Sequence, residues 1–153
     1  MKQILAIALL LIGLSAGAQS ARQGKAADRT AKVVIDRRTG EGVGEYKGET
    51  ATQYYISVQD DGYVAKAGHR VVVYSAAKGQ GIVEVKEWGT VCIRKAPSTS
   101  APVVSKVTYE QGDCPPTLRC LGLSKGWYKV KDDSGRVGYV KATLVKWNWA
   151  DLC

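Results

Sequence analysis

Short apolar segments alternate with Gly-bearing polar turns along most of the chain. Segments rich in Val, Ile and Tyr, such as KVVID, QYYISV, HRVVVYSA and GIVEV, are separated by TGEGVG, DDG and AKGQG. The pattern continues through TVCIRK, VSKVTY, TLRCLG, WYKVKD, RVGYV and LVKW. Such segments between turn residues are typical of short β-strands. Because no stretch combines a helix cap with a long apolar repeat of about 3.6 residues, we predict an all-β fold of the barrel or sandwich type.

The segment GWYKVKD shows the alternation of a half-buried strand most clearly. A period of two places Tyr128 and Val130 on one face, and Trp127, Lys129 and Lys131 on the other. We assign the Tyr–Val face to the core. This assignment predicts that Trp127 lies on a partly exposed face.

The first eighteen residues have the pattern of a signal peptide. One Lys precedes an apolar run from Ile4 to Leu14, and the small residues AGA follow. A membrane span needs about 20 apolar residues, so we expect cleavage and export rather than anchoring. Residues 19–31 are small, polar and charged without periodicity, and we expect a flexible leader there.

The basic charge is concentrated in the C-terminal part. The chain has 22 Lys and Arg against 14 Asp and Glu, for a net charge of +8. Residues 19–87 carry eleven basic and nine acidic residues, whereas residues 88–153 carry ten and five. The basic residues are interspersed rather than clustered, and an exported chain seldom meets nucleic acid. We therefore expect an anionic cell envelope, or solubility alone, to account for the charge.

The four cysteines predict disulfides, because their number is even and export is expected. Extended chain from Cys114 through the Pro pair to Cys120 would separate their Cα atoms by about 20 Å, and a bridge needs about 7 Å or less. We favour Cys92 bonded to Cys114 or Cys120, with Cys153 bonded to the other. Alternatively, Cys120 is a small buried apolar residue. A metal site is not expected, because no CxxC occurs and the lone His69 is far upstream.

The segments VCIRKAPSTSAPVVSKVTYEQGD and TLRCLGLSKGWYKVKDDSGRVGYVKATLV resemble the bacterial SH3 family over about residues 89–146. The resemblance implies a five-stranded barrel with a strand at Arg94, a long RT-type loop over residues 97–113, a three-stranded meander, a helical turn over residues 141–143, and a closing strand that pairs with the first. Cys92 and Ala96 depart from the usual Asn and Gly, and CPP at 114–116 is inserted. We therefore predict a small β-rich module over residues 32–87 and the barrel with a Trp-rich tail over 88–153.

The family is associated with cell-wall peptides and with targeting hydrolases to peptidoglycan. This association makes Trp127, Tyr109 and Tyr139 candidate ligand-binding residues, although the same rings could simply seal the barrel. Eukaryotic relatives grip polyproline with a Trp, a Pro and a Tyr. Polyproline binding is not expected here, because Lys141 and Leu144 occupy the positions of that Pro and Tyr.

The sequence lacks the residue patterns of common hydrolases. Such enzymes attached to this family need a Cys activated by a His, and His69 lies at a predicted turn into a strand. A Ser nucleophile elbow, HExxH and a phosphate loop are absent. We expect Asp132 and Asp133 to form a turn, and Arg94 to brace the loop. The chain is thus predicted to be noncatalytic and without a cofactor.

YISVQDDGYVAKAG, from Tyr55, matches WYKVKDDSGRVGYVKAT, from Trp127, if four residues at the turn are deleted. The match suggests that residues 32–87 are a degenerate SH3-like repeat, although an ordinary hairpin could produce it. In the tail, Trp147 and Trp149 fall on one side and could lie near Trp88. They would either attach the N-terminal module to the barrel or form an exposed patch.

These observations predict an exported, noncatalytic protein that binds a cell-wall peptide or another peptide, without a membrane span. Two alternatives stay open. One is an envelope adaptor or inhibitor that uses the Trp-rich junction. The other is a noncatalytic subunit of a cell-wall hydrolase.

Overall fold

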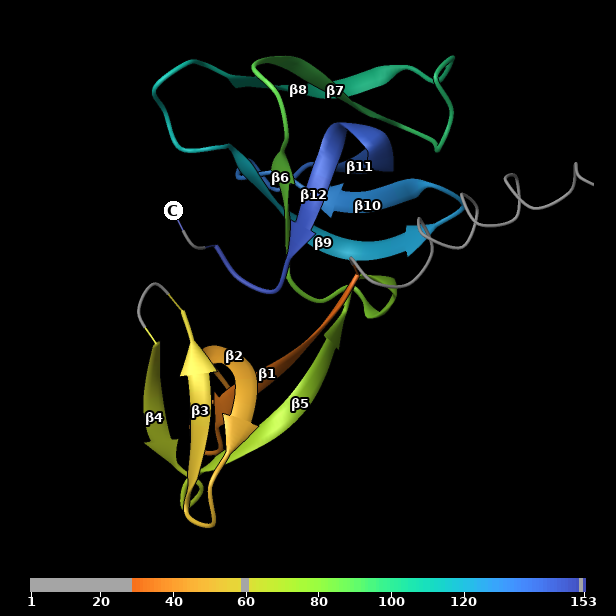
Figure 1. The fold of residues 1–153 in the computed structure, drawn as a ribbon. Coiled ribbons are helices and arrows are strands. Elements are labelled where there is room, and N and C mark those ends of the chain that lie inside the picture. The colour runs from red at the N-terminus through yellow and green to blue at the C-terminus, as the bar shows by residue number, and fades with distance from the viewer. Residues whose placement is uncertain (1–28, 59–60, 152) are drawn as a thin grey trace, which may run out of the picture.

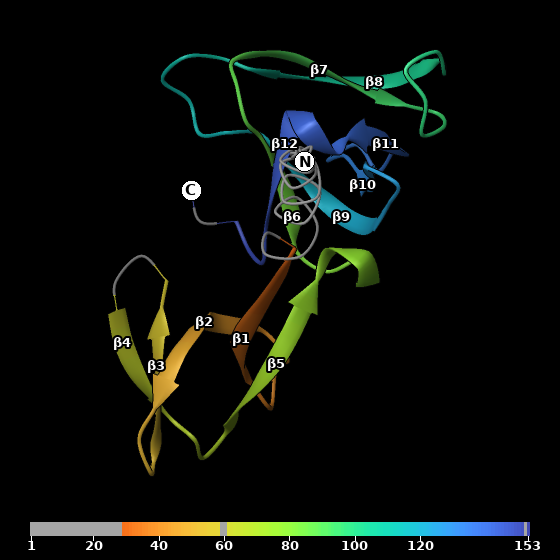
Figure 2. The same cartoon turned by 45° about the vertical axis from the view of Figure 1, so that its right-hand side comes forward.

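The computed structural model describes residues 29–58, 61–151 and 153. This part of the chain forms twelve strands and two short 3-10 turns in two antiparallel sheets, which lie end to end (Figures 1 and 2). The all-β prediction is confirmed. Within the same residues, no helix has the length and apolar character that a membrane crossing requires. The predicted signal peptide, and the leader as far as residue 28, lie outside the described residues.

The first sheet has the order β4-β3-β2-β1-β5. Its strands are β1 (Thr30–Asp36), β2 (Gly42–Glu49), β3 (Gln53–Ser57), β4 (Asp61–Ala65) and β5 (His69–Ser75). Two sequence expectations are wrong here. The expected leader extended to residue 31, but β1 begins at Thr30. The segment TGEGVG, residues 39–44, was expected to form a turn, yet its residues 42–44 belong to β2, which pairs with both neighbouring strands. Gly44 is needed there, since a Cβ would lie 2.8 Å from Ile56 Cβ.

The second sheet has the order β12-β6-β9-β10-β11-β7-β8. It follows the 3-10 turn η1 (Ala76–Lys78) and contains β6 (Ile82–Val85), β7 (Gly89–Arg94), β8 (Val103–Tyr109), β9 (Thr117–Ser124), β10 (Trp127–Lys131), β11 (Val137–Lys141) and β12 (Val145–Asn148), with the 3-10 turn η2 (Ala142–Leu144) before β12. Only residues 86–88 separate β6 from β7 in the sequence. In the strand order of the sheet, however, β6 is second and β7 is sixth. The sheet must therefore curl into a barrel.

The closing strand pairs with β6 and not with the strand that holds Arg94. Val145 lies opposite Val85, and Trp147 lies opposite Val83. The barrel thus begins at Ile82, whereas the predicted boundary between residues 87 and 88 placed this segment in the N-terminal module. The family pattern starts later, at the β7 strand, and so gave no indication of a first strand upstream.

The two sheets share a strand order. In each, the last strand pairs with the first, and a meander follows: β5-β1-β2-β3-β4 in one sheet and β12-β6-β9-β10-β11 in the other. The two sequence segments that match each other form the fourth and fifth positions of these orders. The shared order supports the repeat hypothesis, but common origin stays a prediction. The β7–β8 hairpin is additional in the second sheet.

The main hydrophobic core fills the barrel. Its buried members come from nearly every element: Ala76, Val83, Val85, Val91, Ile93, Leu118, Cys120, Tyr128, Val130, Val140, Val145 and Trp147. Burial of each large apolar side chain contributes roughly 1.5–3 kcal/mol. The first sheet buries fewer side chains, namely Val33, Val34, Ile35 and Ile56. The first sheet therefore depends more on its contacts with the barrel.

The tail Trp residues pack inside the molecule, and Trp149 attaches the first sheet to the barrel. Trp147 is 7% exposed and its indole Nε1 donates to the Gln80 carbonyl at 2.8 Å. The Trp149 ring packs against Gly42 of β2, where a Cβ would lie only 2.7 Å from Cζ3. Trp88 is 60% exposed and lines a groove with neither tail Trp. The expected cluster of three Trp side chains is therefore wrong for Trp88, which the pairing of β12 with β6 separates from the tail.

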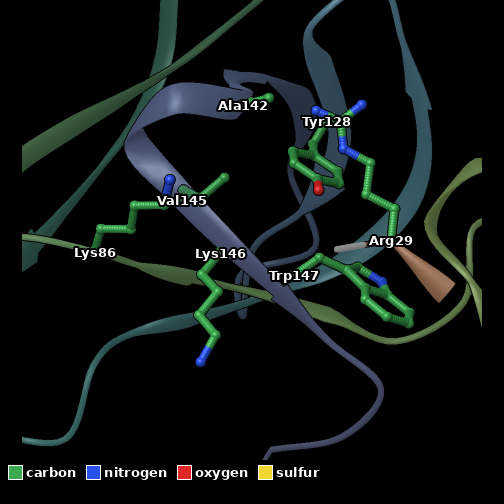
Figure 3. Close-up of a pocket in the computed structure, with 7 residues that line it drawn as sticks. All are labelled: Arg29, Lys86, Tyr128, Ala142, Val145, Lys146 and Trp147. Carbon is green, nitrogen blue, oxygen red and sulfur yellow. The ribbon is translucent and has the colours of Figure 1, made fainter. Parts of the chain in front are cut away.

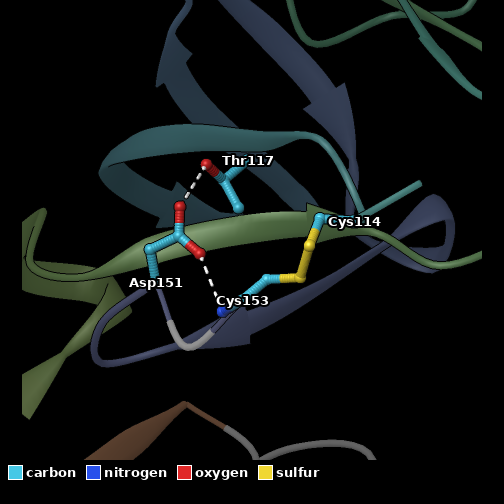
Figure 4. The surroundings of a disulfide bond; sticks show 4 residues. All are labelled: Cys114, Thr117, Asp151 and Cys153. Carbon is cyan, nitrogen blue, oxygen red and sulfur yellow. Dashed lines mark hydrogen bonds between the residues drawn. A yellow bond between two sulfur atoms is a disulfide. The ribbon is translucent and has the colours of Figure 1, made fainter.

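A disulfide joins Cys114 to Cys153, with Cα atoms 5.9 Å apart (Figure 4). Asp151 supports the tail by accepting from Thr117 Oγ1 and from the Cys153 amide, each at 3.2 Å. The expected second bond from Cys92 is wrong, because Cys92 and Cys120 are free thiols. Cys120 is fully buried, and burial raises the pKa of its thiol. Its alternative interpretation, as a small apolar core residue, is confirmed.

Candidate functional site

The outer face of β10 presents Trp127, as alternation predicts. The Tyr128 side chain is 3% exposed and belongs to the core, whereas Trp127 is half-buried. Trp127 lies opposite Lys141 of β11 and Ser124 of β9. The predicted division of the two aromatic residues between surface and core is confirmed.

Tyr139 shares this outer face, but Tyr109 does not. Tyr139 lies opposite Lys129 on β10 and opposite Arg94 on β7, and it is half-buried. Tyr109 packs against the barrel core from β8, two residues from Val107, which also packs there. The structure thus brings Trp127 and Tyr139 to one surface, while Tyr109 packs against the edge of the barrel core. Tyr109 is half-buried, as Trp127 and Tyr139 are, and its role as a ligand contact stays a prediction.

A groove near η2 adds two residues that were not selected as ligand contacts. Its volume is about 180 Å³ and its most exposed apolar side chains are Trp88 at 60% and Leu144 at 46%. The Ala142 amide donates to the Gly126 carbonyl at 2.8 Å, so η2 begins beside the backbone of Trp127 and ends at this groove. We call Trp88, Leu144 and Trp127 the η2 face. Leu144 was noted only as a departure from the polyproline groove, and Trp88 was assigned to the tail junction.

Arg94 braces the RT-type loop, as expected from its outer position. Its Nη1 donates to the Ala101 carbonyl at 2.8 Å, and the Lys95 amide donates to the Pro102 carbonyl at 2.9 Å. These bonds close the loop between β7 and β8. Arg94 therefore positions the loop.

Asp132 forms the β10–β11 turn, as predicted. Its carboxylate accepts from Ser105 Oγ at 2.7 Å, from the Arg136 guanidinium at 2.9 Å and from the Arg136 amide at 2.8 Å. The Ser105 hydrogen bond is the main cause of its lowered pKa, and Arg136 adds to the effect. A carboxylate held in its ionised form is a poor general acid.

The described residues offer no group of three or more His, Cys, Asp or Glu side chains arranged to hold a metal ion. His69 begins β5 in the first sheet, with Nδ1 2.8 Å from the Ala65 carbonyl oxygen. Both free thiols, Cys92 and Cys120, lie in strands of the second sheet. The noncatalytic role of the protein stays a prediction.

Comparison with known proteins identifies the C-terminal part. No curated protein matches the chain. A family model described as the bacterial SH3 domain matches residues 89–146, which span β7 to β11, η2 and the start of β12. The matched segment contains Trp127, Tyr139 and Leu144, while Trp88 and β6 lie immediately before it. Residues 89–146 therefore form a bacterial SH3 domain, as the sequence resemblance predicted.

Proposed function

We propose that this protein is an exported, noncatalytic binding protein that recognises a cell-wall peptide through its SH3 domain. The η2 face is the contact surface. The observation that carries the proposal is the exposure of Trp88 and Leu144 in one groove at the end of η2, whose first residue is bonded to the backbone next to Trp127. Large rigid aromatic side chains supply contact area at a low cost in side-chain entropy.

The surroundings of the η2 face suit a peptide with acidic groups. Lys86 lines the groove itself, and Lys141 lies opposite Trp127 on the neighbouring strand. Glu87 also lines the groove, so the surface has mixed charge with a basic excess. The net charge of +8 favours approach to an anionic envelope.

Export is supported by two features. The disulfide between Cys114 and Cys153 is typical of oxidising compartments, and residues 1–18 have the signal-peptide pattern. A wall peptide would be available to the protein there. The noncatalytic role rests on the missing Cys–His pair described above.

The adaptor or inhibitor alternative requires the Trp-rich junction to be open to a partner. Trp147 is buried and Trp149 contacts Gly42, so intramolecular packing already uses both rings. We therefore favour the η2 face. A noncatalytic hydrolase subunit would use the same face, and it would differ by enhancing the activity of another chain.

Retention on purified peptidoglycan tests the proposal. Trp88→Ala and Trp127→Ala should each weaken retention about tenfold, as expected of central aromatic contacts. Tyr63→Ala is the matched control, because Tyr63 is 59% exposed on β4 of the other sheet. Absence of wild-type retention, or equal retention by all three variants, would exclude the η2 face as the contact surface.

A further inference from the structure

A second cavity lies on the barrel where the chain enters the first sheet. It has a volume of about 390 Å³ and is lined by residues from four parts of the chain: Arg29, Lys86, Tyr128, Ala142, Val145, Lys146 and Trp147 (Figure 3). A cavity of this size lies at the lower end of the range of small-molecule sites. It shares only Lys86 with the groove of the η2 face.

Arg29 is held in place in the lining of this cavity. Its carbonyl accepts from the Ala76 amide at 3.0 Å, and Ala76 is fully buried. Its guanidinium carbon lies 5.9 Å from the centre of the Tyr128 ring. Within the described residues, Arg29 forms no ion pair. A guanidinium stacked on a ring keeps its planar N–H groups, which match a carboxylate in a bidentate arrangement.

Part of the cavity lining is apolar. Ala142 and Val145 supply methyl groups, and Tyr128 and Trp147 supply rings. The indole N–H of Trp147 is already bonded to the Gln80 carbonyl, so its ring contributes an apolar surface. These walls suit a ligand end with small apolar side chains.

The charge that faces the cavity is positive. Its lining includes three basic residues and no Asp or Glu. Lys86 Nζ is fixed by the Thr143 carbonyl at 3.4 Å. The side chain of Lys146 extends away from Tyr128 in Figure 3, and Lys146 lies opposite Glu84 on β6. Arg29 and Lys86 are therefore the cations available to a bound anion.

We propose that this cavity binds the terminal carboxylate of a short peptide with small apolar side chains. Arg29 pairs with the carboxylate, Lys86 adds positive charge, and Tyr128, Val145 and Trp147 contact the side chains. The inference rests on the proposed peptide-binding function and adds a second subsite, specific for the charged end of the ligand. The η2 face would hold another part of the same peptide.

N-acetyl-dialanine and its C-terminal amide, titrated separately into the full chain, test this subsite. The change in the indole N–H resonance of Trp147 in nuclear magnetic resonance spectra reports occupancy. We expect the acid to bind at least tenfold more tightly than the amide. Arg29→Gln should remove this preference, Lys86→Gln should reduce it, and Lys146→Gln should leave it unchanged.

Four results would overturn the subsite: no binding of the acid, equal binding of acid and amide, undiminished preference in Arg29→Gln, or tighter binding of inorganic phosphate than of the acid. Failure of the carboxylate subsite can be distinguished from failure of the proposed function. If Trp88→Ala still lost retention on peptidoglycan while the acid failed to bind, only the carboxylate subsite would be wrong. If the acid bound as expected while the Trp88 and Trp127 variants kept full retention, only the η2 face would be wrong.

Discussion

Loss of the Cys114–Cys153 disulfide should strongly destabilise the protein. The bond links residues 39 positions apart and fixes the tail that carries Trp149 against Gly42. Replacing one partner, as in Cys153→Ser, releases this constraint in the unfolded chain. We expect the free energy of unfolding to fall, because a reduced unfolded chain gains conformational entropy that the oxidised chain lacks.

The magnitude follows from the length of the closed loop. For a separation of 39 residues, the loop-entropy relation gives about 4 kcal/mol at 25 °C. With a denaturant slope of about 2 kcal/mol/M in urea, the midpoint should fall by about 2 M. Urea unfolding without a reductant, followed by Trp fluorescence, measures this change.

Cys92→Ser is the matched control, because Cys92 is a free, half-buried thiol. It should shift the free energy of unfolding by less than about 0.5 kcal/mol. Dithiothreitol should lower the wild-type midpoint to that of Cys153→Ser. The reductant should leave the midpoint of Cys153→Ser itself unchanged. Equal destabilisation by Cys92→Ser and Cys153→Ser would refute the pairing described here, as would a wild-type midpoint that the reductant does not change.

Three further substitutions test the packing and the charges. Gly138→Ala should cost about 1–3 kcal/mol in urea unfolding, because the new Cβ would lie 2.5 Å from Ile93 Cγ2; unchanged stability would contradict the close approach. The lowered pKa of Asp132 means that its ionised form stabilises the fold above its unfolded pKa of about 3.9, and that this stability is lost as pH falls through the lower folded value. Asp132→Asn should therefore lose less stability than the wild type between pH 7 and pH 2; parallel midpoints over this range would argue against the hydrogen bond from Ser105. Trp149→Ala should cost about 2 kcal/mol through lost apolar contact and speed proteolysis of the first sheet; an unchanged cleavage rate would show that the ring does not hold the two sheets together.

Local alternation predicted much of the fold. Strands rich in Val, Ile and Tyr were recognisable, and the period of two in GWYKVKD correctly divided Trp127 from Tyr128. The strand over residues 42–49 was missed, because its glycines have low strand propensity. Close packing of β3 against Gly44 selects Gly there, and this reason is visible only in three dimensions.

Long-range pairing was harder to predict. The family pattern begins at the strand of Arg94, so the pairing of β6 with β12 had no local signal. That pairing separates Trp88 from the tail and places Trp88 in a groove with Leu144. Arg29 was assigned to the leader, because nothing in the sequence shows its stacking on Tyr128. The spacing of the cysteines excluded a bond between Cys114 and Cys120. Only the path of the tail in the structure shows that Cys153 bonds to Cys114.

The most direct test of the central claim is a titration of soluble peptidoglycan fragments, followed by the indole N–H resonances of the four Trp residues. Trp88 and Trp127 should shift together and saturate at one ligand concentration, because both belong to the η2 face. The indole N–H resonance of Trp149, which packs against Gly42, should not shift. Saturating shifts confined to Trp149, or no shift at Trp88 and Trp127, would contradict recognition through the η2 face.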